Sequence, residues 1–203
     1  MSTPPDAAVG LVLAGGRSVR FGGEKAVAVL EGRPLLLWAV DRLRTVCTRV
    51  AANVRPGTEA EGVALAAGLP TLHDAPGDAL GPLAGVKVGL IWAEQLGART
   101  LAVSPCDAPL LPDDLFVRLL ERADGGAAMA ETTDGRQPLC ALWPVSALPA
   151  VREALVGGAH PPTWQVLERI GARKVLFERP EAFTNVNTPD DLSAVKVQRS
   201  RGR

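Results

Sequence analysis

The sequence predicts an α/β fold in which helices pack on a largely parallel sheet. Short apolar runs rich in β-branched residues and bounded by Gly and Pro alternate with segments whose apolar residues recur at helical spacing. Alternation of this kind favours parallel strands joined by right-handed helical crossovers. The length of 203 residues suits one domain with a sizeable core. We therefore expect residues 1–203 to form a single domain.

Seven segments have the length, β-branching and Gly/Pro boundaries of strands. In order they are VGLVLA (9–14), TRVAANV (48–54), LPTLHD (69–74), RTLAVSPCD (99–107), GAAMAET (126–132), QPLCALW (137–143) and RKVLFERP (173–180). The helical patterns between them are 34–46, 58–68, 82–97, 112–123, 146–158 and 162–172. Pro34, Pro112 and Pro189 are each suited to a first helical turn, where the missing N–H costs nothing. The basic tail from about 196 to 203 lacks apolar partners, so we expect it to be disordered.

Composition limits the partners that the protein can attract. The net charge is +0 at pH 7, so no overall field draws the chain to nucleic acid or to an anionic membrane. The N-terminus has no basic region before its apolar run, and no membrane-spanning stretch is present in the sequence. Three widely separated cysteines form no CxxC pair, so we expect reduced, buried thiols. We expect a soluble, cytoplasmic protein that binds neither nucleic acid nor membrane.

The loop after the first expected strand has the composition of a phosphate-binding loop. It reads LAGGRSVRFGGEKA (13–26), with glycines that let backbone N–H groups converge on an anion and with cationic side chains that neutralise it. It is not a Walker A loop, because Lys25 lies between Glu24 and Ala26. It is not a dinucleotide GxGxxG loop either, because no third glycine is in register. A nucleoside triphosphate and a simple mobile turn remain as interpretations.

Three later motifs carry candidate polar residues. Asp107, in SPCDAPLLP, ends an expected strand, where a carboxylate can hold Mg²⁺ against triphosphate oxygens or can simply cap a turn. Asp74 precedes a Gly/Pro-rich turn that leads to GPLAG, a pattern equally typical of a surface loop. Asn185 and Asn187, in FTNVNTPDDL, alternate along an expected strand and so share a face. Two amides on one face can bind a metal or a polar substrate.

Four motifs resemble those of the molybdenum cofactor guanylyltransferase family, and they span nearly the whole chain in the order LAGGRSVRFGGEKA, GPLAG, PCDAPLLP and FTNVNTPDDL. The resemblance implies a Rossmann-like three-layer sandwich of the nucleotide-diphospho-sugar-transferase kind. It also implies transfer of GMP from GTP to the phosphate of molybdopterin, with Mg²⁺ as cofactor and pyrophosphate as product. Transient contact with molybdoenzymes or cofactor-delivery proteins follows from the same resemblance.

The resemblance also implies roles for individual residues. Catalysis would involve Lys25, Arg20 and Asp107, and Asp107 would hold the metal. Substrate contacts would come from Leu13, Ala14, Gly15, Gly16, Lys25, Asn53, Asp74, Gly85, Asp107, Asn185 and Asn187.

The chain departs from the family pattern at three places. Glu24 replaces the usual Asp before the lysine, Gln137-Pro138 replaces a His-Pro pair, and residues 157–171 lack an arginine-rich stretch. A related transferase that uses CTP or another phosphorylated acceptor, and a non-catalytic nucleotide-binding homologue, therefore stay open. Trp164, near the divergent region, either packs in the core or stacks on an acceptor ring.

Overall fold

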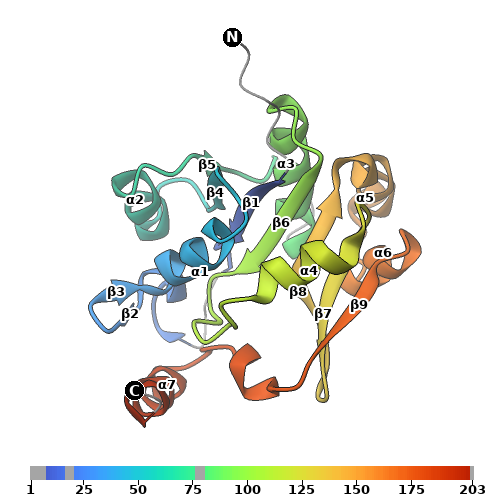
Figure 1. The fold of residues 1–203 in the computed structure, drawn as a ribbon. Coiled ribbons are helices and arrows are strands. Elements are labelled where there is room, and N and C mark those ends of the chain that lie inside the picture. Colours follow the sequence, from blue (N-terminus) through green and yellow to red (C-terminus); the bar gives the residue numbers. More distant parts are fainter. Residues whose placement is uncertain (1–7, 17–20, 76–80, 202–203) are drawn as a thin grey trace.

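A seven-stranded sheet forms the centre of this computed structural model, which describes residues 8–16, 21–75 and 81–201 (Figure 1). In spatial order the strands are β5 (Thr71–Leu72), β4 (Val50–Asn53), β1 (Ala8–Leu13), β6 (Thr100–Pro105), β8 (Gly135–Pro144), β7 (Ala128–Thr132) and β9 (Arg173–Phe177). All seven strands lie where the sequence predicts them. Neighbouring strands are parallel except where β8 pairs with β6 and β7.

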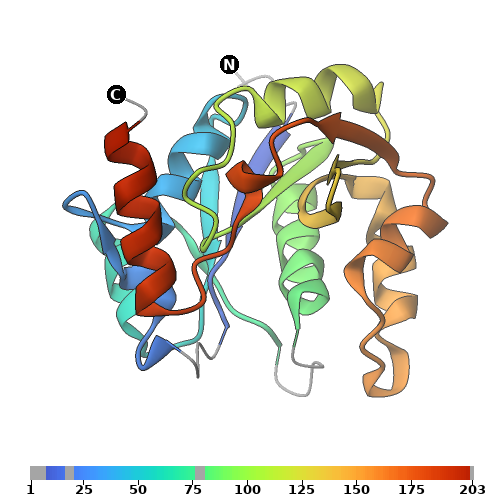
Figure 2. The same cartoon turned by 90° about the horizontal axis from the view of Figure 1, so that it is seen from below.

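Helices cover both faces of the sheet, which confirms the predicted α/β class (Figures 1 and 2). On one face pack α1 (Leu35–Arg44), α2 (Glu59–Ala66) and α4 (Leu115–Ala123), and on the other pack α3 (Pro82–Gln95), α5 (Leu148–Ala154) and α6 (Thr163–Arg169). Strand β1 contributes to both layers, since Val12 faces the α1 side and Leu11 the α3 side. A strand buried on both faces reads as a continuous apolar run, as VGLVLA does.

The direction of β8 is not apparent from the strand pattern. Strands β7 and β8 pair so that Thr132 lies opposite Gly135, which leaves only Thr133 and Asp134 as the connection. A two-residue connection can join only antiparallel strands. The sheet is therefore largely parallel, as predicted, but it contains a reversed strand next to β6.

The structure contains a small hairpin that the sequence does not predict. Strands β2 (Val29–Leu30) and β3 (Arg33–Pro34) are joined by Glu31 and Gly32, both with positive φ, of 50° and 78°. Two consecutive residues in this region form the type I′ turn that suits a tight hairpin. Strands this short carry no readable alternation.

The C-terminal segment returns to this hairpin. Helix α7 (Pro189–Arg201) packs beside it (Figures 1 and 2), and Val186 and Val195 form a small cluster with Leu30 and Leu35. The helix includes most of the segment for which the sequence predicts disorder. It begins with a reciprocal cap, because Asp191 Oδ2 accepts the Thr188 N–H at 2.8 Å and Thr188 Oγ1 accepts the Asp191 N–H at 3.2 Å.

The strand predicted around Asn185 and Asn187 is wrong. Residues 184–187 have no regular structure, and they follow the short 3-10 helix Pro180–Phe183. The Val186 N–H donates to the Asp107 carbonyl at 2.7 Å, and the Val186 side chain is fully buried. One bond to a distant loop and one apolar anchor therefore hold this segment in place of a strand ladder.

Further short 3-10 helices are Lys25–Val27, Val145–Ala147 and Val156–Gly158. Helix α4 begins at Leu115 and not at Pro112 as expected. Within the described ranges, every helix is too short or too polar to cross a lipid bilayer.

Candidate active site

A cavity of about 500 Å³ lies at the carboxyl ends of the central strands. Leu13, the last residue of β1, lies in register with Asn53 of β4 and Pro105 of β6, so the three strands end together. Open α/β sheets bind ligands at this edge. Described residues that line the cavity are Leu13, Ala14, Gly15, Gly16, Glu24, Lys25, Ala26, Asn53, Arg55, Asp74, Gly81, Pro82, Pro105, Cys106, Asp107 and Leu139.

The fold brings Lys25, Asp107 and Asn187 together from three distant parts of the chain. The Lys25 ammonium donates to Asp107 Oδ2 at 2.5 Å and to Asn187 Oδ1 at 2.9 Å. The side chains of Lys25 and Asp107 are only 15% and 17% exposed. Two oxygen atoms thus converge on one cation at the wall of the cavity.

Asn53 and Asp74 form a second polar pair in the cavity. The Asn53 amide donates to Asp74 Oδ1 at 2.9 Å and to the Leu72 carbonyl at 3.3 Å. Asn53 is itself buried, whereas Asp74 is exposed. The pair therefore presents an amide and a carboxylate at fixed positions, which suits recognition of a polar ring edge or a ribose.

Gly85 lies beneath this pair and does not line the cavity among the described residues. A Cβ at position 85 would stand 2.5 Å from Asn53 Oδ1 and 2.7 Å from Leu13 Cδ2. No side chain fits there unless its neighbours move. Gly85, the second glycine of GPLAG, allows α3 to approach β1 and β4 closely. It therefore affects the cavity by leaving room for Asn53.

Of the remaining predicted site residues, some line the cavity and others do not. Leu13, Ala14, Gly15 and Gly16, for which the resemblance implies substrate contacts, line the cavity. Asn185 is exposed and is absent from the lining described. Arg20 lies outside the described residues.

Sequence reasoning missed Arg55 and Leu139 as lining residues. Arg55 follows Asn53 by two positions with the buried Val54 between them, an alternation that could have revealed it. Leu139 lies in an irregularity of β8, because the register jumps from Met129 opposite Ala141 to Ala130 opposite Gln137. Bulges of this kind re-aim side chains next to functional sites, and no local signal predicts them.

The cavity contains a cysteine without a nucleophilic role. Burial, followed by the charge of Asp107, raises the pKa of Cys106 to about 12. The same two causes raise the pKa of Cys140. Cys47, Cys106 and Cys140 are all buried, and none of them forms a disulfide bond, as predicted. Because thiolate is the nucleophilic form, Cys106 remains an inert thiol near neutral pH.

Trp164 is half-buried and is covered by an arginine. The Arg136 guanidinium carbon lies 4.6 Å from the centre of the indole ring, and Arg136 also pairs with Glu168 at 3.1 Å. Trp164 is not among the described residues that line the cavity. The arrangement is a cation–π contact within the divergent region.

Comparison with known proteins identifies the family. The family model described as MobA-like NTP transferase domain matches residues 10–174. The chain belongs to this family. The family resemblance inferred from the four motifs is thereby confirmed.

Curated relatives agree over almost the full length. A molybdenum cofactor guanylyltransferase from Cereibacter sphaeroides is 38% identical, covering 91% of this chain and 93% of the relative. Proteins of the same name from Rhodobacter capsulatus and Cupriavidus taiwanensis are 36% and 37% identical, with 91% and 93% of this chain covered and 92% and 96% of their own.

Solved structures support the fold. The molybdopterin-guanine dinucleotide biosynthesis protein A from Archaeoglobus fulgidus has a TM-score of 0.76 and 24% identity, covering 95% of this chain and 99% of its own. A 4-diphosphocytidyl-2C-methyl-D-erythritol synthase from Anaerococcus prevotii has a TM-score of 0.75 and 10% identity, and the match covers 95% of this chain and 96% of that synthase. At these identities the likeness concerns the fold alone.

Proposed function

We propose that this protein is a molybdenum cofactor guanylyltransferase, which transfers GMP from GTP to the terminal phosphate of molybdopterin and releases pyrophosphate. The observation that carries the proposal is the meeting of Lys25 and Asp107, which line the cavity, with Asn187, which accepts a hydrogen bond from Lys25 and is not among the described lining residues. The names of the curated relatives supply the guanine nucleotide and the acceptor.

The residues present fit a magnesium ion bound together with a triphosphate. Asp107 and Asn187 already direct oxygen atoms at one cation, the Lys25 ammonium. Oxygen is also the ligand atom that Mg²⁺ prefers. Within the described part of the chain, no cluster of three or more His, Cys, Asp or Glu residues could hold a metal. We therefore expect Asp107, with the Asn187 amide oxygen beside it, to hold Mg²⁺ only with help from phosphate oxygens. When bound, the ion would neutralise charge on those oxygens.

The chemistry requires positioning more than proton transfer. An ionised oxygen of the acceptor phosphate attacks the α-phosphorus of GTP. A new P–O bond forms there as the bond to the bridging α–β oxygen breaks and pyrophosphate leaves. An ionised phosphate is already nucleophilic, so no general base is needed. Lys25 and Arg20 would stabilise the leaving pyrophosphate, while the N–H groups of the glycine loop supply fixed dipoles.

The nucleotide would lie across the strand ends. We assign Leu13, Ala14, Gly15 and Gly16 to the nucleoside side, with Asn53 and Asp74 completing it. Asn187, with the exposed Asn185 nearby in sequence, would serve the acceptor side. Residues 1–203 would act as one nucleotidyltransferase domain in the cytoplasm, and transient contact with molybdoenzymes or delivery proteins would pass on the product.

The test measures magnesium-dependent pyrophosphate release from GTP and from CTP, each with and without molybdopterin carrying molybdenum, with Asp107→Ala as the blank. We expect release with GTP only when the acceptor is present. Release with CTP would replace the guanylyl assignment by a cytidylyl one. Silence with both nucleotides from folded protein that binds GTP would overturn the proposed acceptor.

A further inference from the structure

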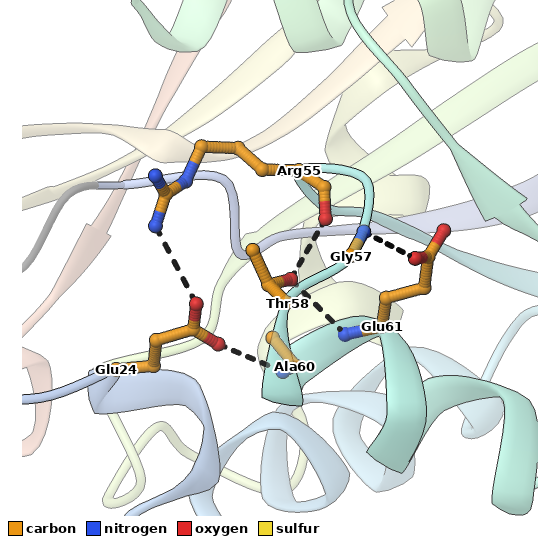
Figure 3. A network of polar contacts seen from close by, with 6 residues as sticks. All are labelled: Glu24, Arg55, Gly57, Thr58, Ala60 and Glu61. Atoms are coloured by element: carbon orange, nitrogen blue, oxygen red, sulfur yellow. Dashed lines mark hydrogen bonds and ion pairs between the residues drawn. The ribbon is translucent and has the colours of Figure 1, made fainter.

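Arg55 is a cationic residue of the cavity to which neither the motifs nor the relatives assign a role. It lines the cavity just beyond Asn53, and its side chain is 46% exposed. Its contact in the structure is with Glu24, whose Oε1 lies 3.4 Å from Arg55 Nη2 (Figure 3). Charge-assisted hydrogen bonds of full strength are about 2.7–2.9 Å long. The Arg55 guanidinium is therefore held weakly.

Glu24 keeps its position independently of Arg55. Its second oxygen accepts the Ala60 N–H at 2.8 Å, in the first turn of α2 (Figure 3). That turn has further caps, since Gly57 N–H donates to Glu61 at 2.7 Å and Thr58 Oγ1 accepts the Glu61 N–H at 3.4 Å. If Arg55 moved away, the bond between Glu24 and the Ala60 N–H and the start of α2 would both stay in place.

The two cations that line the described part of the cavity differ in how tightly they are held. Lys25 has two short contacts, with Asp107 and Asn187, and little exposure. Arg55 has the longer contact and the greater exposure. Because Glu24 directly precedes Lys25, the guanidinium also lies beside the loop that carries the proposed phosphate-binding lysine.

We propose that Arg55 is a further triphosphate-binding residue beside Lys25, and that it exchanges its ion pair with Glu24 for nucleotide phosphate oxygens when GTP binds. The proposal rests on the proposed function and deepens it. Arginine suits the role because its planar fork matches two phosphate oxygens at once. Glu24 then acts as a competitor that holds the guanidinium near the site while the cavity lacks a nucleotide.

The experiment compares nucleotide affinities by titration calorimetry in the presence of Mg²⁺. We expect Arg55→Ala to weaken GTP binding about tenfold, the equivalent of one charge-assisted hydrogen bond. GMP should be affected much less, because it lacks the β- and γ-phosphates. Arg55→Lys, which keeps the charge, should retain most of the affinity. The control is Arg173→Ala, far from the cavity lining, since Arg173 is 59% exposed and contacts Asp124 at 3.4 Å, although it also donates to the Arg122 carbonyl at 3.0 Å.

Glu24→Gln separates exchange from a purely structural pair. If Glu24 competes for Arg55, this substitution should tighten GTP binding by about two- to fivefold, the range of an exposed ion pair. The gain should shrink in the Arg55→Ala background, as a double-mutant cycle would reveal. Thermal unfolding of each variant checks that the fold is retained.

Any one of the following results would overturn the inference. They are unchanged GTP affinity in Arg55→Ala, equal weakening by Arg55→Ala and Glu24→Gln, and a gain from Glu24→Gln that is the same in both backgrounds. A raised KM for the acceptor with unchanged GTP affinity would place Arg55 on the acceptor phosphate and also reject the assignment. Arg55-dependent GTP binding without pyrophosphate release would leave the inference standing and reject the proposed function.

Discussion

At the scale of single residues, the site depends on pairs whose members lie far apart in the sequence. Lys25 and Asp107 form an ion pair that neither motif predicts by itself. Removing either member leaves the other charge in a mostly buried setting without this partner. Function and local electrostatics are therefore tied to the same two side chains.

Lys25→Ala and Asp107→Ala should each lower turnover about a hundredfold or more, the scale of one preorganised transition-state contact. The reason is that the lysine stabilises phosphate charge and the aspartate holds the metal. Steady-state pyrophosphate release measures the effect, and a cooperative thermal transition should show that each variant still folds, at a lowered temperature because the remaining charge loses its partner. Near-normal turnover in either variant would contradict these roles.

Gly85→Ala should weaken nucleotide binding although Gly85 does not line the described cavity. The added methyl would lie 2.5 Å from Asn53 Oδ1, so Asn53 must shift. We expect a loss of about 1–3 kcal/mol in the free energy of unfolding, typical of overpacking, together with weaker GTP binding. Urea denaturation and GTP titration measure the two effects.

The matched control for Gly85 is Gly62→Ala in α2, where an added Cβ would meet nothing within 4 Å. This variant should gain up to about 1 kcal/mol through helix propensity and should leave GTP affinity unchanged. Similar behaviour of the two variants would show that the contact with Asn53 is not the cause.

The raised pKa of Cys106 makes stability fall at high pH. The folded thiol releases its proton near pH 12, whereas an ordinary thiol does so near 9, so the unfolded state loses its proton first. The stabilising effect is complete below about pH 9 and is lost as the pH rises toward 12. When the pH rises from about 8 to about 10.5, the free energy of unfolding of Cys106→Ala should fall by about 2 kcal/mol less than that of the wild type. Parallel urea titrations at the two pH values measure this difference, and equal losses would contradict it.

At the scale of elements, the start of α7 controls one side of the site. Asp191 Oδ2 accepts the N–H groups of Asn187 and Thr188, each at 2.8 Å. The same carboxylate thereby caps the helix and orients the residue that contacts Lys25. A helix-capping side chain is in this way coupled to the cavity.

Asp191→Ala should cost about 0.5–2 kcal/mol of stability and should also lower turnover, because Asn187 loses its backbone anchor. Asp190→Ala is the control, since Asp190 is an exposed acidic residue in the same first turn. Denaturation and turnover assays on both variants measure the effect. If the two variants behave alike, the effect comes from the negative charge at the helix end and not from the hydrogen bond to the Asn187 N–H.

At the scale of the whole molecule, the chain closes on itself around the cavity. The glycine loop near the N-terminus and the segment before α7 meet through Lys25 and Asn187, and the cluster that includes Leu30 and Val195 fixes them side by side. We therefore expect ligand binding at the loop to affect the C-terminal segment as well.

Hydrogen exchange should reveal this closure. Addition of GTP with Mg²⁺ is expected to slow exchange in residues 21–27 and 184–191 together, because Lys25 of the first segment donates to Asn187 of the second. Residues 173–177, in the edge strand β9, should not change. Protection that appears at the loop alone would separate the two segments.

The sequence by itself determined the pieces with strong local signals. Seven strands and six helical patterns followed from apolar periodicity, and the glycine loop and Asp107 followed from motifs at strand ends. These properties depend on neighbours within a few positions, so the local pattern records them. The order of the motifs was sufficient to indicate the family.

Only the tertiary structure decided which side chains meet. The reversed β8, the irregular segment around Asn187 and the positions of Arg55 and Leu139 depend on contacts between distant segments. Asn187 reaches Lys25 because Val186 is buried and bonded to the Asp107 carbonyl, and not because a strand aligns it. Such an arrangement depends on the packing of the whole chain, for which a local pattern carries no record.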